Sequence, residues 1–380
     1  MDSNDRLTFS AEWKDTFSSV NWKFNLFFYP SDETVELYDL LKHRLFLKRT
    51  KCGNFTIDDF YIGASLRICS RLITIKDYAD SYTRKKVEIT SQKSCGFIKP
   101  DLMHRKGEVL QLLESSNFKI INLKMVQLPE SLANTIFEDY EDQSILTPLI
   151  EHVTSGPVLC FQVLNENSVI RLLDLAGPED PKNIIASGSD ALRARFGADK
   201  IRNGIYVSTS AENAHRDALL LFSPKESPYD YLPPVASFDE SFCCVIKPHT
   251  VKEAKIGQIM MTIEEAGYQI SGVFMVMLST EQAEQFHEVY KYVVTEYQNM
   301  VSELCSSPCV AMEVRGRFEK NSHSEFRKLA GPFDPELAKE LRPDTIRARF
   351  GKNCAQNAIH VTDLVEDCPL EVEFFFKKIS

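Results

Sequence analysis

The stretch Ile346-Arg-Ala-Arg-Phe-Gly351, followed by Asn357, decides how this sequence is interpreted, because it occurs twice. The first copy is Leu192-Arg-Ala-Arg-Phe-Gly197, followed by Asn203, at an offset of 154 residues (346 − 192). Self-similarity at one fixed offset is the sequence signature of a repeated structural unit. The chain is therefore predicted to contain two homologous domains.

Working outward from these stretches, Leu175-Ala-Gly-Pro-Glu-Asp-Pro181 matches Leu329-Ala-Gly-Pro-Phe-Asp-Pro335 at the same offset. Phe97-Ile-Lys-Pro100 matches Val245-Ile-Lys-Pro248 further upstream, with a small shift. We predict a first repeat over residues 93–222 and a second over 241–380, each about the size of an independent domain. Prolines within residues 223–240 interrupt any helical or strand period and predict a linker there.

The segment before the repeats has a different pattern. Its aromatic or β-branched runs are short and separated by turn residues, which is typical of strands. The runs are Trp22–Tyr29, Thr34–Tyr38, Arg44–Leu47 and Leu72–Ile75. A polar stretch, Asp80–Lys86, marks the boundary that follows. Residues 1–88 are therefore predicted to form a small all-β domain.

Each repeat alternates strand and helix patterns. In the second copy, apolar residues at helical spacing predict a helix after the Lys-Pro pair, with Ile256, Ile259, Met260 and Ile263 on one face. The expected elements after it are a strand at Tyr268–Met277, a long helical region at Glu281–Cys305, a strand at Cys309–Val314, a helix near Glu325–Ala330 and a final strand, turn and helix. This order predicts an α+β fold of two tandem ferredoxin-like βαββαβ domains.

Composition narrows the range of functions. The 380 residues are 43% hydrophobic, which is typical of globular proteins, and 44 basic against 54 acidic residues give a net charge of −10. That balance does not favour nucleic acid as a partner. We also expect no membrane span and no secretory signal. Ten cysteines without a Cys-x-x-Cys pair predict a reduced, cytoplasmic protein, with Cys305 and Cys309 as packing residues and not zinc ligands.

Candidate chemistry gathers in the second repeat around His360, at the end of a short apolar run. A histidine at a strand end is more often structural than catalytic, but its neighbours in the repeat include several cations. These polar and cationic residues are Lys247, Arg327, Arg347 and Asn357. Because a core does not gather cations without an anion to receive them, a polyphosphate is the expected ligand. Glu371 could hold one imidazole nitrogen and leave the other free to attack.

Taken in order, the motifs Ile-Lys-Pro, Gly-Pro-x-Asp-Pro, Ile-Arg-Ala-x-Phe-Gly, Asn-x-x-His and Glu-x-x-Phe-Phe make the chain resemble the nucleoside diphosphate kinase family, in two copies. The resemblance implies that His360 takes the γ-phosphoryl group and that Glu371 supports it. It implies that Lys247, Arg327, Arg347 and Asn357 contact phosphates and ribose and that Tyr297 stacks on the base. It further implies Mg²⁺ held through the nucleotide phosphates, with no metal site of the protein's own.

Three residues depart from the family pattern in the second repeat. Phe333 stands in place of a small hydroxyl, His249 in place of an acid, and Val361 in place of a glycine. Each could crowd the pocket or change its charge. The sequence therefore leaves open whether the second repeat is an active enzyme.

In the first repeat, the resemblance places Tyr206 where His360 stands in the second, and a tyrosine cannot form a phosphohistidine. Leu173, Leu146 and Asp217 replace Arg327, Tyr297 and Glu371, respectively. The residues that remain are Lys99, Arg193 and Asn203. We expect a degenerate site there, in which weak nucleotide binding remains an option.

A β-rich domain before two such repeats resembles the axonemal type of the family, its seventh member. This resemblance implies a structural, microtubule-associated protein inside ciliary or flagellar doublet microtubules, located in the cytoplasm and cytoskeleton, with tubulin and axonemal proteins as partners. The basic stretch Lys42–Lys51 suits acidic tubulin; from charge alone a solvated strand face is the favoured explanation, and only the resemblance favours docking. The alternative is an active nucleoside diphosphate kinase or autophosphorylating enzyme. We expect a monomer whose repeats pair as a pseudo-dimer.

Overall fold

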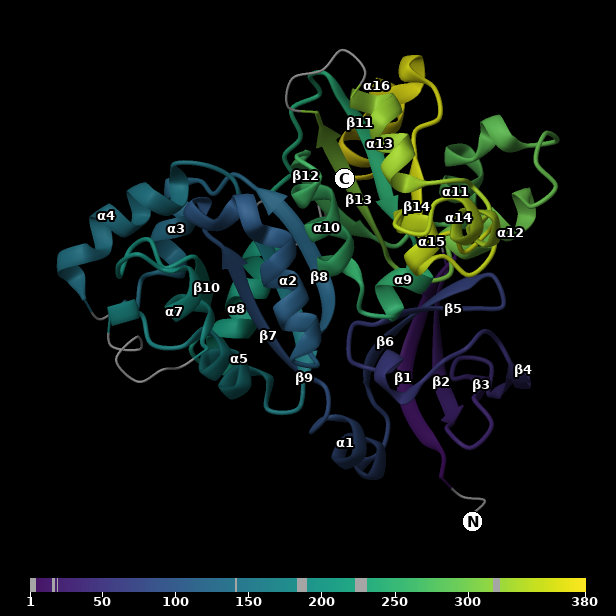
Figure 1. The fold of residues 1–380 in the computed structure, drawn as a ribbon. Helices are drawn as coiled ribbons and strands as arrows, with labels where there is room; N and C mark the ends of the chain where they lie inside the picture. The colour runs from purple at the N-terminus through teal and green to yellow at the C-terminus, as the bar shows by residue number, and fades with distance from the viewer. Residues whose placement is uncertain are drawn as a thin grey trace.

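The computed structural model describes residues 5–15, 18, 20–140, 142–182, 190–222, 231–316 and 322–380. Figure 1 shows three bodies: the N-terminal domain in purple, the first repeat in blue to teal, and the second repeat in green to yellow. The predicted α+β class, with an all-β domain ahead of two related α+β domains, is confirmed.

The N-terminal domain is one antiparallel sheet with strand order β4-β3-β2-β1-β6-β5. Its elements are β1 (Leu7–Lys14), β2 (Asn21–Tyr29), β3 (Thr34–Asp39), β4 (Arg44–Lys51), η1 (Ile57–Asp59), β5 (Ser65–Ile68) and β6 (Arg71–Tyr78). Alternate residues of β2 and β3 are buried, as a half-buried sheet requires. The four predicted strands are present, whereas β1 and β5 were not predicted. Phe9, Phe28 and Phe60 stack at the centre of its core.

The polar stretch predicted as a boundary is in fact a short helix, α1 (Ser81–Val87). Asp80 caps its N-terminus by accepting a hydrogen bond from the Thr83 amide at 2.7 Å. The Thr83 hydroxyl in turn accepts from the Thr8 amide of β1 at 2.8 Å. The polar residues therefore start a helix that is tied to the sheet.

The two repeats contain matching elements. In the first they are β7 (Gln92–Ile98), η2 (Pro100–Arg105), α2 (Lys106–Ser115), β8 (Lys119–Val126), α3 (Glu130–Ile136), α4 (Gln143–Thr154), β9 (Val158–Asn165), α5 (Ser168–Ala176), α7 (Leu192–Phe196), β10 (Ile205–Val207) and α8 (Ala211–Phe222). In the second they are β11 (Ser241–Ile246), α9 (Pro248–Lys252), α10 (Ile256–Glu265), β12 (Gln269–Val276), α11 (Thr280–Phe286), η3 (Glu288–Tyr290), α12 (Tyr297–Leu304), β13 (Cys309–Arg315), α13 (Ser322–Ala330), α14 (Pro335–Leu341), α15 (Ile346–Phe350), β14 (Ile359–Val361), η4 (Val365–Asp367), α16 (Cys368–Glu373) and η5 (Phe374–Ile379).

The predicted long helical region at Glu281–Cys305 is wrong, because the structure divides it into α11, η3 and α12. Tyr292 adopts a left-handed backbone conformation with φ of 65°, which a continuous helix cannot contain. Tyr292 and Val293 are also largely exposed, so no packing holds that stretch in a helix. The helix α14 was not predicted either.

Both repeats contribute to one eight-stranded sheet with order β10-β7-β9-β8-β12-β13-β11-β14. Strands β8 and β12 join the halves in antiparallel pairing, with Phe274 opposite Lys124. The order is therefore the same when it is followed outward from this junction through either repeat. The two repeats form a pseudo-dimer within one chain.

Helices α2 and α10 pack against each other at this junction, and a glycine of each lies against the backbone of the other. A Cβ atom on Gly107 would lie 2.3 Å from the backbone nitrogen of Met261, and one on Gly257 would lie 2.0 Å from that of Gln111. Glycine is therefore required at both positions, because any side chain would push the helices apart.

Two glutamates cap the crossing helices reciprocally. Glu114 of α2 accepts hydrogen bonds from the Ile256 and Gly257 amides, at 3.0 and 2.9 Å. Glu264 of α10 accepts from the Gly107 amide at 3.1 Å. Each carboxylate thus satisfies amides at the start of the other helix, which stabilises the junction.

The described part of the predicted linker, residues 231–240, has no regular secondary structure but is packed onto both repeats. Lys124 of the first repeat donates to the Leu232 carbonyl at 2.8 Å. Glu313 of the second repeat accepts from the Ser237 and Phe238 amides at 2.7 and 2.6 Å. Residues 223–230 of the predicted linker lie outside the described residues.

The N-terminal domain contacts both repeats. Arg67 of β5 donates to the Leu278 carbonyl and to the Thr280 hydroxyl of the second repeat, at 2.8 and 3.0 Å. Asp59 pairs with Lys119 of the first repeat at 2.9 Å. The domain therefore lies against the pseudo-dimer from its β5 side, as Figure 1 shows.

Candidate functional site

His360 is held in the middle of β14, which pairs with β11 at Val245. The residue is 5% exposed, and its ring lies 4.8 Å from that of Phe286, centroid to centroid. Its Nε2 atom is 2.8 Å from Oε2 of Glu371 on α16. The following segment turns back toward β14, so residues separated by eleven positions meet side by side.

Glu371 is itself held in place. The Thr362 hydroxyl donates to the same carboxylate oxygen at 2.7 Å. Because Nε2 of His360 faces a carboxylate, that nitrogen carries the proton and Nδ1 keeps its lone pair. Among the residues that the structure describes, none makes a hydrogen bond with Nδ1. The arrangement therefore leaves Nδ1 as the nucleophilic atom of the ring.

Two cations of the same repeat, buried Lys247 and partly buried Arg347, have no carboxylate partner within the described ranges. Lys247 donates to the Ala355 carbonyl at 2.8 Å. Arg347 donates to the Gly331 carbonyl at 2.9 Å and to the Ile359 carbonyl at 3.3 Å. Burial, together with the nearby Arg347, lowers the pKa of Lys247 to about 7. An anion that entered here would meet charges that the protein has not neutralised.

Arg327 is placed differently, at an exposed position on α13. It donates to the backbone carbonyl of Asp363 at 2.7 Å and to its carboxylate at 2.9 Å. The Tyr290 hydroxyl donates to the other oxygen of this carboxylate at 2.5 Å. Asp363 therefore already binds the Arg327 guanidinium, which the sequence analysis expected to contact phosphate. A bound phosphate would have to displace Asp363 or share the guanidinium with it.

The side-chain amide of Asn357 is only half satisfied. Its Nδ2 donates to the Phe333 carbonyl at 3.0 Å, whereas its buried Oδ1 has no partner among the described residues. A buried acceptor without a donor is rare and favours a ligand hydroxyl at that point. Phe333, one of the departures from the family pattern, contributes its carbonyl to this contact and leaves its ring partly exposed.

Tyr297 does not present a free ring. It is 6% exposed and packs in the apolar cluster of the second repeat, with Leu278, Val301 and Leu304. The structure therefore brings His360 and Glu371 together, places Lys247, Arg347 and Asn357 in the same repeat next to β11 and β14, and sets Arg327 at the edge. It does not display Tyr297 for stacking.

Sequence reasoning missed several residues of the site. His287 is fully buried, and neither of its ring nitrogens has a hydrogen-bond partner in the described parts of the chain. Its ring centroid lies 6.0 Å from that of His360. Burial and the nearby His360 and Lys247 hold the pKa of His287 well below its ordinary value, so it is neutral. It stands far from any motif, so only the fold could reveal it; Thr362, two residues after His360, could have been noticed from a strand's period of two.

The first repeat keeps the same framework without the imidazole. The Tyr206 hydroxyl donates to Asp217 at 2.8 Å, and the Ser208 hydroxyl donates to the same oxygen at 2.6 Å. Lys99 donates to the Asn203 side chain at 2.7 Å. Arg193 donates to the Gly177 and Ile205 carbonyls, as Arg347 does to their counterparts. A cavity of about 500 Å³ remains here, but acidic side chains of Asp139, Asp174 and Glu179 line it.

The part of the chain that the structure describes has no group of three or more His, Cys, Asp or Glu side chains placed to hold a metal ion. Its helices are all too short or too polar to cross a membrane.

Comparison with known proteins agrees with the architecture. The family profile described as nucleoside diphosphate kinase matches residues 92–227 and 240–380. Nucleoside diphosphate kinase homolog 7 of Rattus norvegicus is 38% identical over 376 residues, which cover 98% of this chain and 93% of that protein. The Mus musculus protein of the same name is 37% identical over the same shares of both chains.

Other relatives match a smaller share of the chain. Thioredoxin domain-containing protein 3 of Homo sapiens is 31% identical over 281 residues, which cover 73% of this chain and 44% of that protein. Among solved structures, the nucleoside diphosphate kinase of Aquifex aeolicus is 29% identical over 37% of this chain and 96% of that chain, with a TM-score of 0.34. Because the family profile covers both repeats and the homolog 7 proteins match nearly from end to end, the chain belongs to the nucleoside diphosphate kinase family.

Proposed function

We propose that the second repeat transfers phosphoryl groups from nucleoside triphosphates to nucleoside diphosphates through His360. The observation that carries this proposal is the hydrogen bond between Nε2 of His360 and Glu371, which leaves Nδ1 as the free nucleophile. Two cations without carboxylate partners among the described residues, buried Lys247 and partly buried Arg347, belong to the same site.

In the first step, Nδ1 of His360 attacks the γ-phosphorus of the triphosphate while the bond to the β-phosphate oxygen breaks. The diphosphate leaves with that electron pair. The imidazole keeps the proton on Nε2, which remains hydrogen-bonded to Glu371. In the second step, a terminal phosphate oxygen of another diphosphate attacks the phosphohistidine, which restores the neutral ring. Positioned cations offset the charge on the transferred group, which is the main requirement of phosphoryl transfer.

The proposed nucleotide contacts follow from the geometry. Lys247 and Arg347 face the phosphates, and Asn357 offers its unpaired Oδ1 to a ribose hydroxyl. Arg327 would join them after it leaves Asp363. Mg²⁺ would supply further charge neutralisation while it is held by the nucleotide phosphates. Tyr297, because it is buried, is the member of the proposed set with the least support.

The experiment is incubation of the full chain with γ-labelled ATP and Mg²⁺, followed by addition of a nucleoside diphosphate. Acid-labile label should appear on the protein and pass to the diphosphate. His360→Ala should lose both signals, whereas Tyr206→Phe, its counterpart in the first repeat, should keep them. Absence of label on folded wild-type protein would contradict the proposal.

A second candidate function is that of a structural protein of ciliary or flagellar microtubules, with tubulin as its partner. The observation that favours it is the basic edge of the N-terminal sheet, because β4 ends the sheet and its charged side chains are exposed. Arg49 and Lys51 pair with Asp32 and Glu33, but Arg44 and Lys48 form no ion pair among the described residues. An unpaired basic strand edge suits an acidic protein surface.

Co-sedimentation with microtubules tests this second function. The charge reversals Arg44→Glu and Lys48→Glu together should weaken sedimentation at least tenfold, and added salt should do the same. Exposed Lys339→Glu on α14 is the matched control. If His360→Ala still sediments normally, the structural and enzymatic roles are separate. Microtubule binding that ignores both the charge reversals and salt would contradict docking through β4.

The junction between the repeats also bears on assembly. Because β8 and β12 already pair within one chain, we propose a monomeric protein. The resemblance to the axonemal type of the family supports a cytoplasmic and axonemal location. Sedimentation velocity of the full chain should give one species near 43.4 kDa. A hexamer would contradict this proposal.

A further inference from the structure

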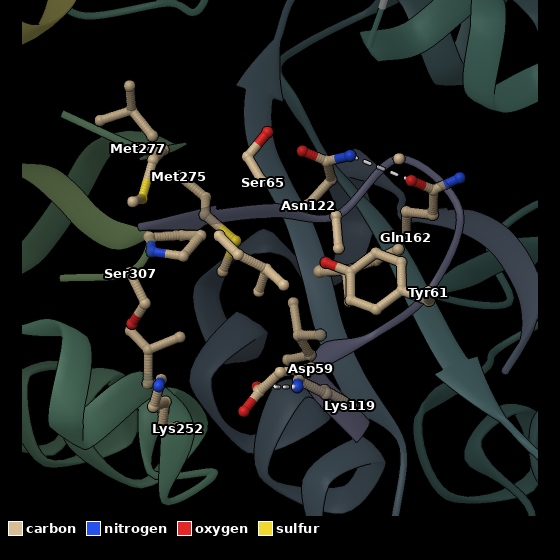
Figure 2. A pocket seen from close by; sticks show the side chains of 18 of the residues that line it. Asp59, Tyr61, Ser65, Lys119, Asn122, Gln162, Lys252, Met275, Met277 and Ser307 are labelled. Carbon is tan, nitrogen blue, oxygen red and sulfur yellow. Dashed lines mark hydrogen bonds and ion pairs between the residues drawn. The ribbon is translucent and has the colours of Figure 1, made fainter. Parts of the chain in front are cut away.

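A cavity of about 220 Å³ lies where the N-terminal domain meets both repeats, apart from the two nucleotide sites. Figure 2 shows it from close by. Asp59 and Tyr61 come from the N-terminal domain, Lys119 from β8 of the first repeat, and Lys252 and Ser307 from the second repeat. A molecule bound here would touch all three parts of the chain at once.

The cavity is positively charged. Its lining includes three lysines, Lys93, Lys119 and Lys252, but only one carboxylate, that of Asp59. Asp59 pairs with Lys119 at 2.9 Å, as the dashed line in Figure 2 marks. Burial by itself would raise the pKa of Asp59, yet Lys119 and Lys252 hold it below its ordinary value, so this carboxyl is ionised. Two positive charges remain without a balancing anion.

The two lysines without a balancing anion are Lys93 and Lys252, and Lys93 has the stronger evidence. Its ammonium donates to the Ile62 carbonyl at 2.7 Å and forms no ion pair within the described residues. Burial lowers its pKa, as expected for a cation removed from water without a counter-charge. Lys252 is exposed to solvent and forms no ion pair in the same part of the chain either; its ammonium lies 5.7 Å from the Phe55 ring centroid.

Uncharged groups complete the lining. The Ser307 hydroxyl is buried and has no hydrogen-bond partner among the described residues. The side chains of Asn122 and Gln162 bond to each other at 3.0 Å, which leaves one amide oxygen and one amide nitrogen for a ligand. Tyr61 and Met275 add apolar surface. A few polar groups set in an apolar wall are typical of small-molecule sites.

We propose that this cavity binds a small phosphorylated organic molecule, with its phosphate facing Lys93 and Lys252 and its organic part against Tyr61 and Met275. A phosphate monoester carries about two negative charges at neutral pH, which matches the two unbalanced ammonium groups. A carboxylate, with one charge, would leave one of them unpaired. This site is independent of the phosphoryl transfer proposed for His360.

Binding has a structural consequence. Because the walls come from three domains, the ligand would bind the assembled chain better than one in which the N-terminal domain has separated. Ligand binding therefore stabilises the docked arrangement by mass action. The cavity would make attachment of the N-terminal domain responsive to a metabolite.

The test is isothermal titration of the full chain with AMP and, separately, with inorganic phosphate. AMP should bind with one site, and the double variant Lys93→Met and Lys252→Met should bind it at least tenfold more weakly. Exposed Lys85→Met on α1 is the matched control and should bind normally. Binding of inorganic phosphate as tight as that of AMP would show that the site takes a free anion, which would overturn the organic part of the proposal.

The variant Lys247→Met distinguishes AMP binding in the cavity from AMP binding at the nucleotide site of the second repeat. AMP binding that survives Lys247→Met but is lost in the double variant supports the cavity, and the reverse result overturns it. Acetylation of the wild-type protein gives a readout without substitution. AMP should protect Lys93 and Lys252, but not Lys85, from the reagent, and equal labelling with and without AMP would overturn the proposal.

Discussion

In the second repeat Glu371 accepts hydrogen bonds from His360 and Thr362, and in the first Asp217 accepts them from Tyr206 and Ser208. The distances agree to within 0.1 Å, since they are 2.8 and 2.7 Å in one repeat and 2.8 and 2.6 Å in the other. The fold therefore keeps this triangle, a carboxylate with two hydrogen-bond donors, in both repeats, whether or not the site can perform chemistry. A supporting carboxylate alone is no sign of catalysis in this family.

What differs is the side chain at the position of His360, which is Tyr206 in the first repeat. Burial and the neighbouring Asp217 raise the pKa of Tyr206 well above its ordinary value, so its hydroxyl stays protonated and acts only as a donor. The imidazole of His360 keeps a second nitrogen for attack. Tyrosine in place of histidine, together with the shorter Asp217 and Ser208 beside it, thus leaves the first repeat with a structural hydrogen bond and no free ring nitrogen.

A second pair is inverted between the repeats. After the first Lys-Pro, Asp101 bonds to His152 at 2.9 Å, and after the second, His249 bonds to Glu303 at 2.8 Å. His249, which the sequence suggested could change the charge of the pocket, therefore has a carboxylate partner on α12. The acid and the base have exchanged places and the contact has been kept.

The largest expected effect tests whether the two halves need each other. Gly257→Ala or Gly107→Ala should destabilise the protein by about 3 kcal/mol or more, because the new Cβ meets backbone atoms of the facing helix. Urea denaturation should show one transition splitting into two. Gly156→Ala, whose new Cβ would lie 3.6 Å from its nearest neighbour, the Cβ atom of Pro100, is the control and should remain near wild type. An unchanged single transition in Gly257→Ala would mean that the helices can separate freely.

The second prediction compares the two capping glutamates across pH. Burial raises the pKa of Glu114 from 4.5 to about 7. The folded state therefore binds the proton of the Glu114 carboxyl more tightly than the unfolded state does. The contribution of this proton to the free energy of unfolding is fully present below pH 4.5 and is lost as pH rises to about 7. The loss can reach about 3 kcal/mol. Glu114→Gln should flatten the unfolding free energy across this window.

Glu264 provides the contrast, because it pairs with buried Lys106 at 2.9 Å. Glu264→Gln should destabilise the protein, and more so as pH rises, because burial also raises the pKa of Glu264 and only its ionised form neutralises the ammonium of Lys106. If both variants gave the same pH profile, the two halves of the junction would be electrostatically equivalent, contrary to the structure.

The third prediction concerns the two triangles. Glu371→Gln should lower phosphoryl transfer by about tenfold to a hundredfold, because the imidazole loses the carboxylate that fixes its tautomer and orientation. Asp217→Asn in the first repeat should leave the transfer rate unchanged. Steady-state transfer to a nucleoside diphosphate measures both. A similar loss in the two variants would show that the first repeat takes part in the reaction.

The smallest effect concerns the inverted pair. His249→Asp and Glu303→His should each destabilise the protein, and the double variant, which copies the order of the first repeat, should recover about 1 kcal/mol. A double-mutant cycle of unfolding free energies measures the coupling. Strict additivity would indicate that the two side chains are merely neighbours.

The sequence predicted the duplicated architecture because the repeat was explicit, and it placed His360 and Glu371 together through their spacing and family motifs. It failed where tertiary contacts decide. The helix expected over Glu281–Cys305 is broken at Tyr292. Strands β1 and β5 were also missed, although both alternate apolar and polar residues, so there the local pattern was present and was overlooked. His287 beside His360 belongs to no motif and was found only through its burial.

By itself, then, the sequence determined that this chain carries two copies of one domain, that only the second retains an imidazole, and that a different β domain precedes them. Those conclusions depend on residue identity and order, which the chain states directly. Only the tertiary structure decided that β8 and β12 merge the copies into one sheet, that Asp363 occupies Arg327, that Tyr297 is buried, and that three lysines meet in one cavity. These facts arise from contacts between residues far apart in the chain, and no local pattern records such contacts.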